Sequence, residues 1–208
     1  MLNDDHAAIR LPDPGQPPLS DPTRLWLYAV TQWRRLFGLN ISRIDELLFV
    51  GGAFTPAQWI ELRALGIRAV LSLQAEREDH FDGTPPERTL RLPVQDFHPP
   101  SIDQLHDAVA FILACRADGL PVLVHCHAGV GRASLTASAY LISSGLSHLE
   151  AFSRIKRARP IVELNALQLA RLIEWEWRLR AQITIDPPSH GHSVDSPYAE
   201  QIAISSHS

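Results

Sequence analysis

One cysteine of the chain lies between a short apolar run and a glycine-containing segment that ends in arginine. The segment reads His125-Cys126-His127-Ala128-Gly129-Val130-Gly131-Arg132. A loop that leaves a buried strand and enters a helix has backbone N–H groups free to bind an anion. Gly129 and Gly131 allow the chain to curl so that successive amides point inward. Cys126 would then lie in a positive field from these amides, the helix dipole and Arg132, which favours the nucleophilic thiolate.

The arginine at the end of this segment indicates which anion is bound. A guanidinium presents a planar fork of donors that matches two oxygens of a phosphate group. We therefore expect the loop to hold a phosphoryl group and the Cys126 thiolate that attacks it. The alternative is a buried, inert thiol beside an ordinary glycine turn, which leaves the combination of residue types unexplained. The expected phosphate-binding residues are His127, Ala128, Gly129, Val130, Gly131 and Arg132.

Composition is that of a single globular domain. The chain has 208 residues, of which 45% are hydrophobic and 20% charged, and its formal net charge is -4. This charge argues against a broad basic surface for nucleic acid or anionic membranes. Two cysteines cannot form a disulfide framework, so we expect a reducing, cytoplasmic location. No signal peptide is recognisable, and no apolar run approaches the ~20 residues that a membrane-spanning helix needs.

Ten histidines could indicate a metal site, but their spacing does not. No His-x3-His or Cys-x2-Cys pair is present, and His190, His192 and His207 lie in a segment rich in Ser and Pro. Metal sites usually show such ligand spacing. We therefore expect no metal and no cofactor.

The elements that must position the cysteine loop alternate along the chain. Apolar runs predict strands at 47–50, 67–73, 89–92 and 121–125, and the last is apolar enough to be buried on both faces. Capping signals predict helices that begin after Thr55, Ser101 and Ser147. Further helices are expected at 133–144 and 164–181. Strands separated by helices indicate an α/β fold with a mostly parallel central sheet flanked by helices on both faces.

The two ends of the chain differ from this core. Residues 1–20 are rich in proline and are expected to be an extended or disordered leader, and residues 183–208 a flexible tail. Within residues 21–39 a helix is expected from the Asp21–Pro22 start to Phe37, with an apolar stripe at helical spacing. Such a stripe could contact a membrane surface or a partner, but packing across the domain is the commoner reason for one. The core domain is therefore expected at 40–182.

The cysteine loop resembles the Cys-x5-Arg signature of the protein tyrosine phosphatases, specifically the compact dual-specificity branch. Three stretches carry the resemblance: residues 125–132; residues 92–100, which read Leu-Pro-Val-Gln-Asp-Phe-His-Pro-Pro and are similar to the mobile general-acid loop; and Arg159-Pro160 followed by Gln168. The third is similar to a pattern of small atypical members. The resemblance covers about residues 40–181 and implies the dual-specificity phosphatase fold.

The resemblance also implies roles for individual residues. Cys126 would attack the phosphorus while Asp96 protonates the leaving oxygen and later deprotonates the attacking water, since an alkoxide leaves badly without a proton. Gln168 would orient that water, although a solvated helix face explains a glutamine nearly as well. Most members carry Ser or Thr directly after the arginine; here Ala133 stands there, and Ser134 follows. Ser134 is a second candidate to position the water, and its hydroxyl could also supply the one that Ala133 lacks. Asp103 and Asp107 compete with Asp96 for the acid, but Asp103 lies in a helix first turn, where carboxylates are common for structural reasons.

The expected function is therefore hydrolysis of phosphomonoesters through a phosphocysteine, most simply on phosphotyrosine, phosphoserine and phosphothreonine of proteins. Phospholipid and RNA 5′-phosphate phosphatases use the same scaffold and remain alternatives. The absence of lysine at His127, Ala128 and Val130 weakens a polyphosphoinositide substrate. A phosphate-binding regulatory module with little turnover is the alternative of a different class.

Overall fold

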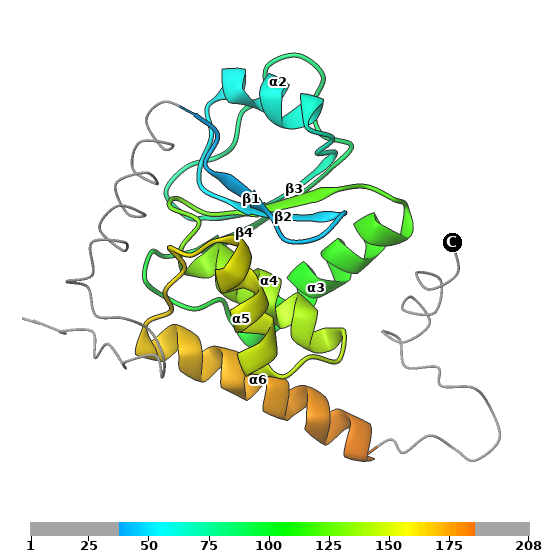
Figure 1. Ribbon diagram of the computed structural model, residues 1–208, viewed down its shortest axis with the longest axis vertical. Helices are drawn as coiled ribbons and strands as arrows, with labels where there is room; N and C mark the ends of the chain where they lie inside the picture. Colours follow the sequence, from blue (N-terminus) through cyan, green and yellow to red (C-terminus); the bar gives the residue numbers. More distant parts are fainter. Residues whose placement is uncertain (1–37, 186–208) are drawn as a thin grey trace, which may run out of the picture.

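The computed structural model of the chain describes residues 38–185, and their side chains through residue 182. The expected leader, the expected helix through Phe37 and the expected tail beyond Ile185 lie outside the described residues. The described part is an α/β fold with one central sheet, as the alternation of strands and helices predicted (Figure 1).

The central sheet has five strands in the order β1-β2-β5-β3-β4. They are β1 Ile41–Arg43, β2 Leu48–Gly51, β3 Ala69–Gln74, β4 Arg88–Val94 and β5 Val122–His125. Only the edge pair β1–β2 is antiparallel, so the expectation of a mostly parallel sheet is confirmed. The strand β1 was not predicted, because its three residues are partly exposed and carry no recognisable apolar run.

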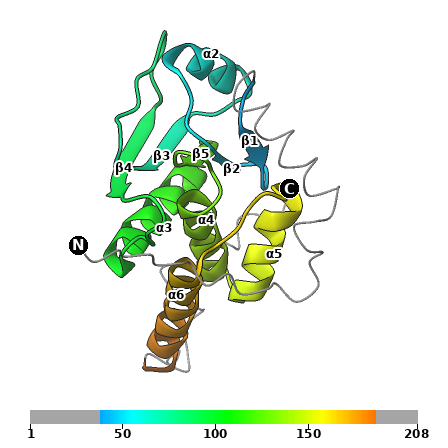
Figure 2. The same cartoon turned by 90° about the vertical axis from the view of Figure 1, so that its left-hand side faces the viewer.

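Helices cover both faces of the sheet, as expected. Figures 1 and 2 show α2 on one face and α3, α4 and α5 on the other, with α6 farther out against α4. Their bounds are α2 Pro56–Ala64, α3 Ile102–Ala117, α4 Arg132–Ser143, α5 His148–Ala158 and α6 Ala166–Ile185. Capping boxes at Thr55, Ser101 and Ser147 begin α2, α3 and α5. The last helix ends at Ile185 rather than near Ala181, so the first residues of the expected tail are helical. None of the helices within residues 38–185 is both long and apolar enough to cross a membrane.

The strand β5 is buried on both faces, as its apolar sequence predicted. Val122 and Val124 pack into the larger core beneath α3–α6, whereas Leu123 packs with Trp59 into a smaller core beneath α2. The helix that follows β5 is also central, because every residue of α4 from Arg132 through Ile142 is buried. The cysteine loop therefore joins two of the most enclosed elements of the fold, which fixes both of its ends.

We expect Ser101→Ala to lower the free energy of unfolding by about 1 kcal/mol, the usual cost of losing an N-cap. The Ser101 hydroxyl accepts a hydrogen bond from the Gln104 amide at 3.1 Å, and alanine cannot. Urea denaturation followed by circular dichroism measures the difference. The matched control is Ser153→Ala, an exposed position within α5, which should change stability by less than about 0.5 kcal/mol. Equal effects of the two substitutions would contradict the capping role.

Candidate active site

The anion loop, defined as residues 126–132, connects the carboxyl end of β5 to the first turn of α4. Three successive carbonyls of this loop accept hydrogen bonds from surrounding elements. The His127 carbonyl accepts from the Ala53 amide at 3.0 Å. The Ala128 carbonyl accepts from Asn40 Nδ2 at 3.2 Å. In a planar trans peptide the N–H points opposite to the carbonyl, so these contacts turn the next amides toward the inside of the loop.

Arg159, at the end of α5, provides the main support of these carbonyls. Its Nε donates to the Gly129 carbonyl at 2.6 Å, and its Nη2 donates to the Ala128 carbonyl at 3.0 Å. The same Nη2 donates to Asn40 Oδ1 at 2.7 Å. The residue is 4% exposed, and a buried guanidinium is tolerated only when such acceptors compensate for its lost hydration. In the sequence, Arg159 stands out only through the resemblance of Arg159-Pro160 and Gln168 to a family pattern. The structure shows which groups it contacts.

Gly129 is the residue that the loop geometry requires most strictly. Its φ is +68°, in the left-handed region that favours glycine. A Cβ at this position would come within 2.4 Å of the Gly51 backbone. The Gly129 amide donates to Cys126 Sγ at 3.2 Å. This donation stabilises a thiolate on a residue that is 2% exposed.

Arg132 is buried. Nη1 of its guanidinium makes structural hydrogen bonds, whereas Nε and Nη2 make none within the described part of the chain. Nη1 donates to the Val94 carbonyl at 2.6 Å and to both carboxylate oxygens of Glu76, at 2.9 and 3.1 Å. Within the described part of the chain, Nε and Nη2 of Arg132 have no hydrogen-bond partner although both are buried. These two nitrogens form one edge of the guanidinium, the edge that can bind two phosphate oxygens.

Glu76 is a site residue that sequence reasoning missed. Burial alone would raise the pKa of its carboxyl, but a hydrogen bond from its own backbone and the charge of Arg132 outweigh burial, so the pKa is lowered. The carboxylate therefore remains charged and fixes the guanidinium. A sequence signal was available, because Glu76 follows the carboxyl end of β3, which pairs with β5. The carboxyl ends of parallel strands meet at one edge of a sheet, where sites form.

The acid loop, defined as residues 95–100, places Asp96 beside Arg132. Asp96 Oδ1 lies 2.9 Å from Arg132 Nη2, although the two groups are not aligned for a hydrogen bond. The Asp96 side chain is 50% exposed, so solvent screens this ion pair. The competing candidates Asp103 and Asp107 are exposed residues of α3. Of the three candidate acids, the one at the guanidinium is thus Asp96, which the resemblance indicated.

The structure also brings Gln168 and Ser134 to the anion loop. Gln168 is 3% exposed, and a Cβ on Gly131 would come within 2.7 Å of its Nε2. The alternative of a solvated helix face for Gln168 is therefore wrong. Ser134 is fully buried, and its hydroxyl donates to the Gly129 carbonyl at 3.3 Å. That bond supports the loop from outside; Ala133, also buried, carries no hydroxyl.

His125, directly before the nucleophile, has a structural partner that the sequence did not reveal. Its Nε2 lies 2.8 Å from Asp79 Oδ2, and its ring packs against Phe54 with centroids 5.0 Å apart. Burial raises the pKa of Asp79, but the hydrogen bond and charge of His125 outweigh this and lower it. The pair anchors the end of β5.

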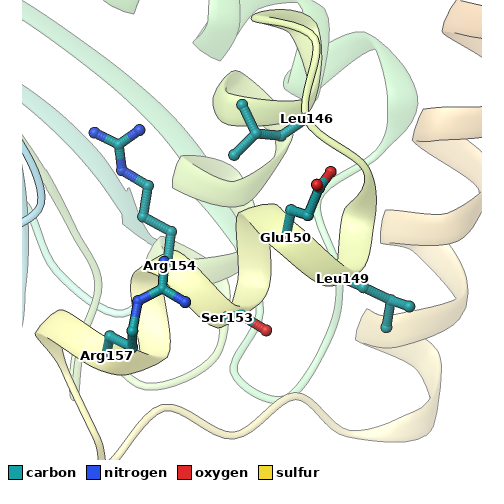
Figure 3. Close-up of a pocket in the computed structure, with 6 residues that line it drawn as sticks. All are labelled: Leu146, Leu149, Glu150, Ser153, Arg154 and Arg157. Atoms are coloured by element: carbon teal, nitrogen blue, oxygen red, sulfur yellow. The ribbon is translucent and has the colours of Figure 1, made fainter.

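The surface also has an open cavity of about 490 Å³ along α5, outside the two loops. Its lining residues are Leu146, Leu149, Glu150, Ser153, Arg154 and Arg157 (Figure 3). None of them belongs to the anion loop or the acid loop. Among residues 38–185, no group of three or more His, Cys, Asp or Glu side chains is arranged to hold a metal ion.

Comparison with known proteins agrees with this geometry. Residues 48–178 match the family model of the dual specificity phosphatase catalytic domain. Dual specificity protein phosphatase 1-B of Xenopus laevis is 31% identical over 140 residues, which cover 66% of this chain and 37% of that protein. Human dual specificity protein phosphatase 12 is 34% identical over 164 residues, which cover 77% of this chain and 45% of that protein. The chain thus spans less than half the length of these curated relatives.

A solved structure shares the fold over most of the described residues. A mouse putative dual specificity phosphatase, solved as a complex with zinc tungstate, superposes with a TM-score of 0.63 and 30% sequence identity. The match covers 72% of this chain and 94% of the mouse chain. The residues that match the family model include both the anion loop and the acid loop. The chain belongs to the dual-specificity phosphatase family.

Proposed function

We propose that this chain is a cysteine-dependent protein phosphatase that hydrolyses phosphotyrosine, phosphoserine and phosphothreonine through a phosphocysteine. The observation that carries the proposal is the anion loop, in which an amide donates to Cys126 Sγ and two nitrogens of Arg132 make no hydrogen bond in the described structure. Membership of the family supports protein substrates. The proposed reaction needs no group beyond those of the chain and water.

In the first step, the Cys126 thiolate attacks the phosphorus, so the S–P bond forms while the P–O ester bond breaks. A phosphate held by Nε and Nη2 of Arg132 takes the position next to Nη2 that the Asp96 carboxyl now occupies. The displaced carboxyl then lies near the ester oxygen and gives it a proton. A positioned general acid of this kind contributes about 10²–10⁴ in rate.

In the second step, water attacks the phosphocysteine. The Asp96 carboxylate takes a proton from the water, the new O–P bond forms, and the S–P bond breaks to restore the thiolate. Gln168 is buried against Gly131 and is the amide side chain available to orient the water. The Gly129 amide, 3.2 Å from Sγ, stabilises the departing thiolate.

We expect Cys126→Ser to abolish turnover of an aryl phosphate while retaining affinity for tungstate, because the inward amides remain. Arg132→Ala should weaken both, since it removes two charge-assisted donors. Steady-state kinetics and calorimetric titration measure the two effects. Activity that persists in Cys126→Ser, or that a chelator abolishes, would contradict the mechanism.

The same assay separates the alternatives for the wild-type chain. Phosphotyrosine, phosphoserine and phosphothreonine peptides should be hydrolysed. Turnover restricted to phospholipids or RNA 5′-phosphates would move the chain to another substrate class on this scaffold. Tungstate binding without turnover of any phosphomonoester would identify a regulatory binding module.

Asp96→Asn should slow hydrolysis by about 10²–10⁴-fold for phenyl phosphate, whose leaving oxygen needs a proton. The loss should be much smaller for 4-nitrophenyl phosphate, because its leaving group departs as a stable anion. The measurement is kcat/KM, which reports the first step, across a series of substituted phenyl phosphates. A loss that is the same for every leaving group would indicate a general structural role for Asp96.

The alanine after Arg132 should make the second step limiting. A hydroxyl there can donate to the departing Cys126 thiolate, and one such donor is worth roughly 10²-fold or more in the step it serves. Because the Ser134 hydroxyl donates to the Gly129 carbonyl, we expect it not to compensate for Ala133. Rapid-quench kinetics with 4-nitrophenyl phosphate should show a burst near one equivalent per active site, and Ala133→Ser should remove it.

Ser134→Ala is the control for this experiment. It should leave the burst present, because the hydroxyl of Ser134 is used by the loop backbone. A wild type without a burst, in which Ser134→Ala creates one, would show instead that Ser134 serves the thiolate.

A further inference from the structure

We propose that Asn165 and Arg171 of the α6 region are positioning residues that hold the general acid Asp96 at the reaction centre by binding the backbone of the acid loop. The proposal rests on the proposed function, because it concerns the proton transfer in that reaction. Neither residue is expected to touch the substrate; each acts through the loop.

The part of the acid loop around Asp96 is not held in place by burial of its own side chains. Residues 95–98 are all exposed, and Phe97 is 73% exposed. Phe97 also has a φ of +61°, a conformation that costs free energy for any residue with a Cβ. An exposed loop with such a backbone keeps its shape only if other contacts determine it.

Side chains of the α6 region provide those contacts by donating to loop carbonyls. Asn165 Nδ2 donates to the Phe97 carbonyl at 2.7 Å. Arg171 Nη1 donates to the Pro100 carbonyl at 2.6 Å. Gln168, between them in sequence, makes a long and therefore weak contact of 3.5 Å with the loop. Positions 165, 168 and 171 are each three apart, so they lie along one side of the helix and follow the loop.

These contacts keep the Asp96 carboxyl close to Arg132 when a phosphate displaces it from Nη2, because the side chain is bound to the same backbone. Asp96 Oδ1 accepts a hydrogen bond from the Phe97 amide at 3.0 Å. Asn165 therefore binds the carbonyl of Phe97, and the amide of the same residue orients the carboxyl of Asp96. His98 Nδ1 adds a hydrogen bond to the Asp96 carbonyl at 2.9 Å. A displacement of about 1 Å of a catalytic group can reduce its effect 10²-fold.

The α6 region that donates these hydrogen bonds is itself well fixed in the fold. Asn165 Oδ1 accepts from the Gln168 amide at 2.9 Å, which caps the helix. Trp175, fully buried, donates its Nε1 proton to the Ala139 carbonyl of α4 at 3.0 Å. The anion loop leads directly into α4. The α6 region, which holds the acid loop, is therefore packed on the helix that begins at Arg132.

The test uses variants that remove each donor and keep the helix. Asn165→Ser retains an N-cap hydroxyl for the Gln168 amide but is too short to reach the Phe97 carbonyl. Arg171→Ala removes the donor to Pro100, and Arg171→Lys should restore part of its effect. We expect Asn165→Ser and Arg171→Ala each to lower kcat/KM for phenyl phosphate about tenfold, the effect of losing one hydrogen bond. The loss of kcat/KM for 4-nitrophenyl phosphate should be small.

The decisive measurement repeats both substitutions in the Asp96→Asn background. If the two residues act through Asp96, they should cause no further loss there, whereas a general structural effect would multiply. The matched control is Glu174→Gln, which removes the charge of the other partner of Arg171, at 3.1 Å, without touching the loop; its kcat/KM should equal that of the wild type. Urea denaturation checks that each variant is folded.

Each outcome separates this proposal from the proposed function. A large, leaving-group-dependent loss in Asp96→Asn, with none in Asn165→Ser and Arg171→Ala, would overturn the positioning role and leave the mechanism intact. Losses that are equal in the wild-type and Asp96→Asn backgrounds would also overturn it. No leaving-group dependence in Asp96→Asn itself would overturn the assignment of the acid, and the positioning role with it.

Discussion

The outward orientation of three successive carbonyls, those of residues 127–129, determines what the anion loop can do. Peptide planarity links each outward carbonyl to an inward amide, so the positive interior depends on what binds the carbonyls outside. The donors are the Ala53 amide, Asn40 and the buried Arg159. They come from three separate segments, one just before β1, one just after β2 and one at the end of α5. The catalytic loop is thus local in sequence, but its conformation is a property of the whole fold.

Most elements of this fold were predictable because their signals are local. The capping boxes at Thr55, Ser101 and Ser147 involve residues three apart, and all three helices begin where those signals placed them. The buried strand β5 is likewise evident from its continuous apolar run. The strand β1 escaped prediction because its pairing with β2, rather than its own composition, makes it a strand. No strong stop signal marks the end of α6 in the sequence, so the position of that end could not be predicted, and the helix continues to Ile185.

The site divides in the same way. Cys126, Arg132 and the two glycines are contiguous and were identified from their types and spacing, whereas Asp96 was identified only through resemblance to a family. Contacts that join distant residues had no pattern to reveal them: Glu76 with Arg132, and Asp79 with His125. The sequence shows that such residues follow strand ends, but not which acid reaches which base. That choice depends on side-chain packing in three dimensions.

The guanidinium of Arg132 illustrates why this packing matters for chemistry. A cation that must attract a phosphate is here paired with the Glu76 carboxylate, which would seem to neutralise it. Yet Glu76 is 40% exposed, so water screens its charge more than it screens the buried guanidinium. The carboxylate binds Nη1 and thereby fixes the plane of the group, leaving Nε and Nη2 directed at one ligand. A lysine could not satisfy both demands, because its single ammonium has no second edge to present. The ion pair thus gives up some attraction and gains a fixed orientation for the two donors that we propose bind the phosphate.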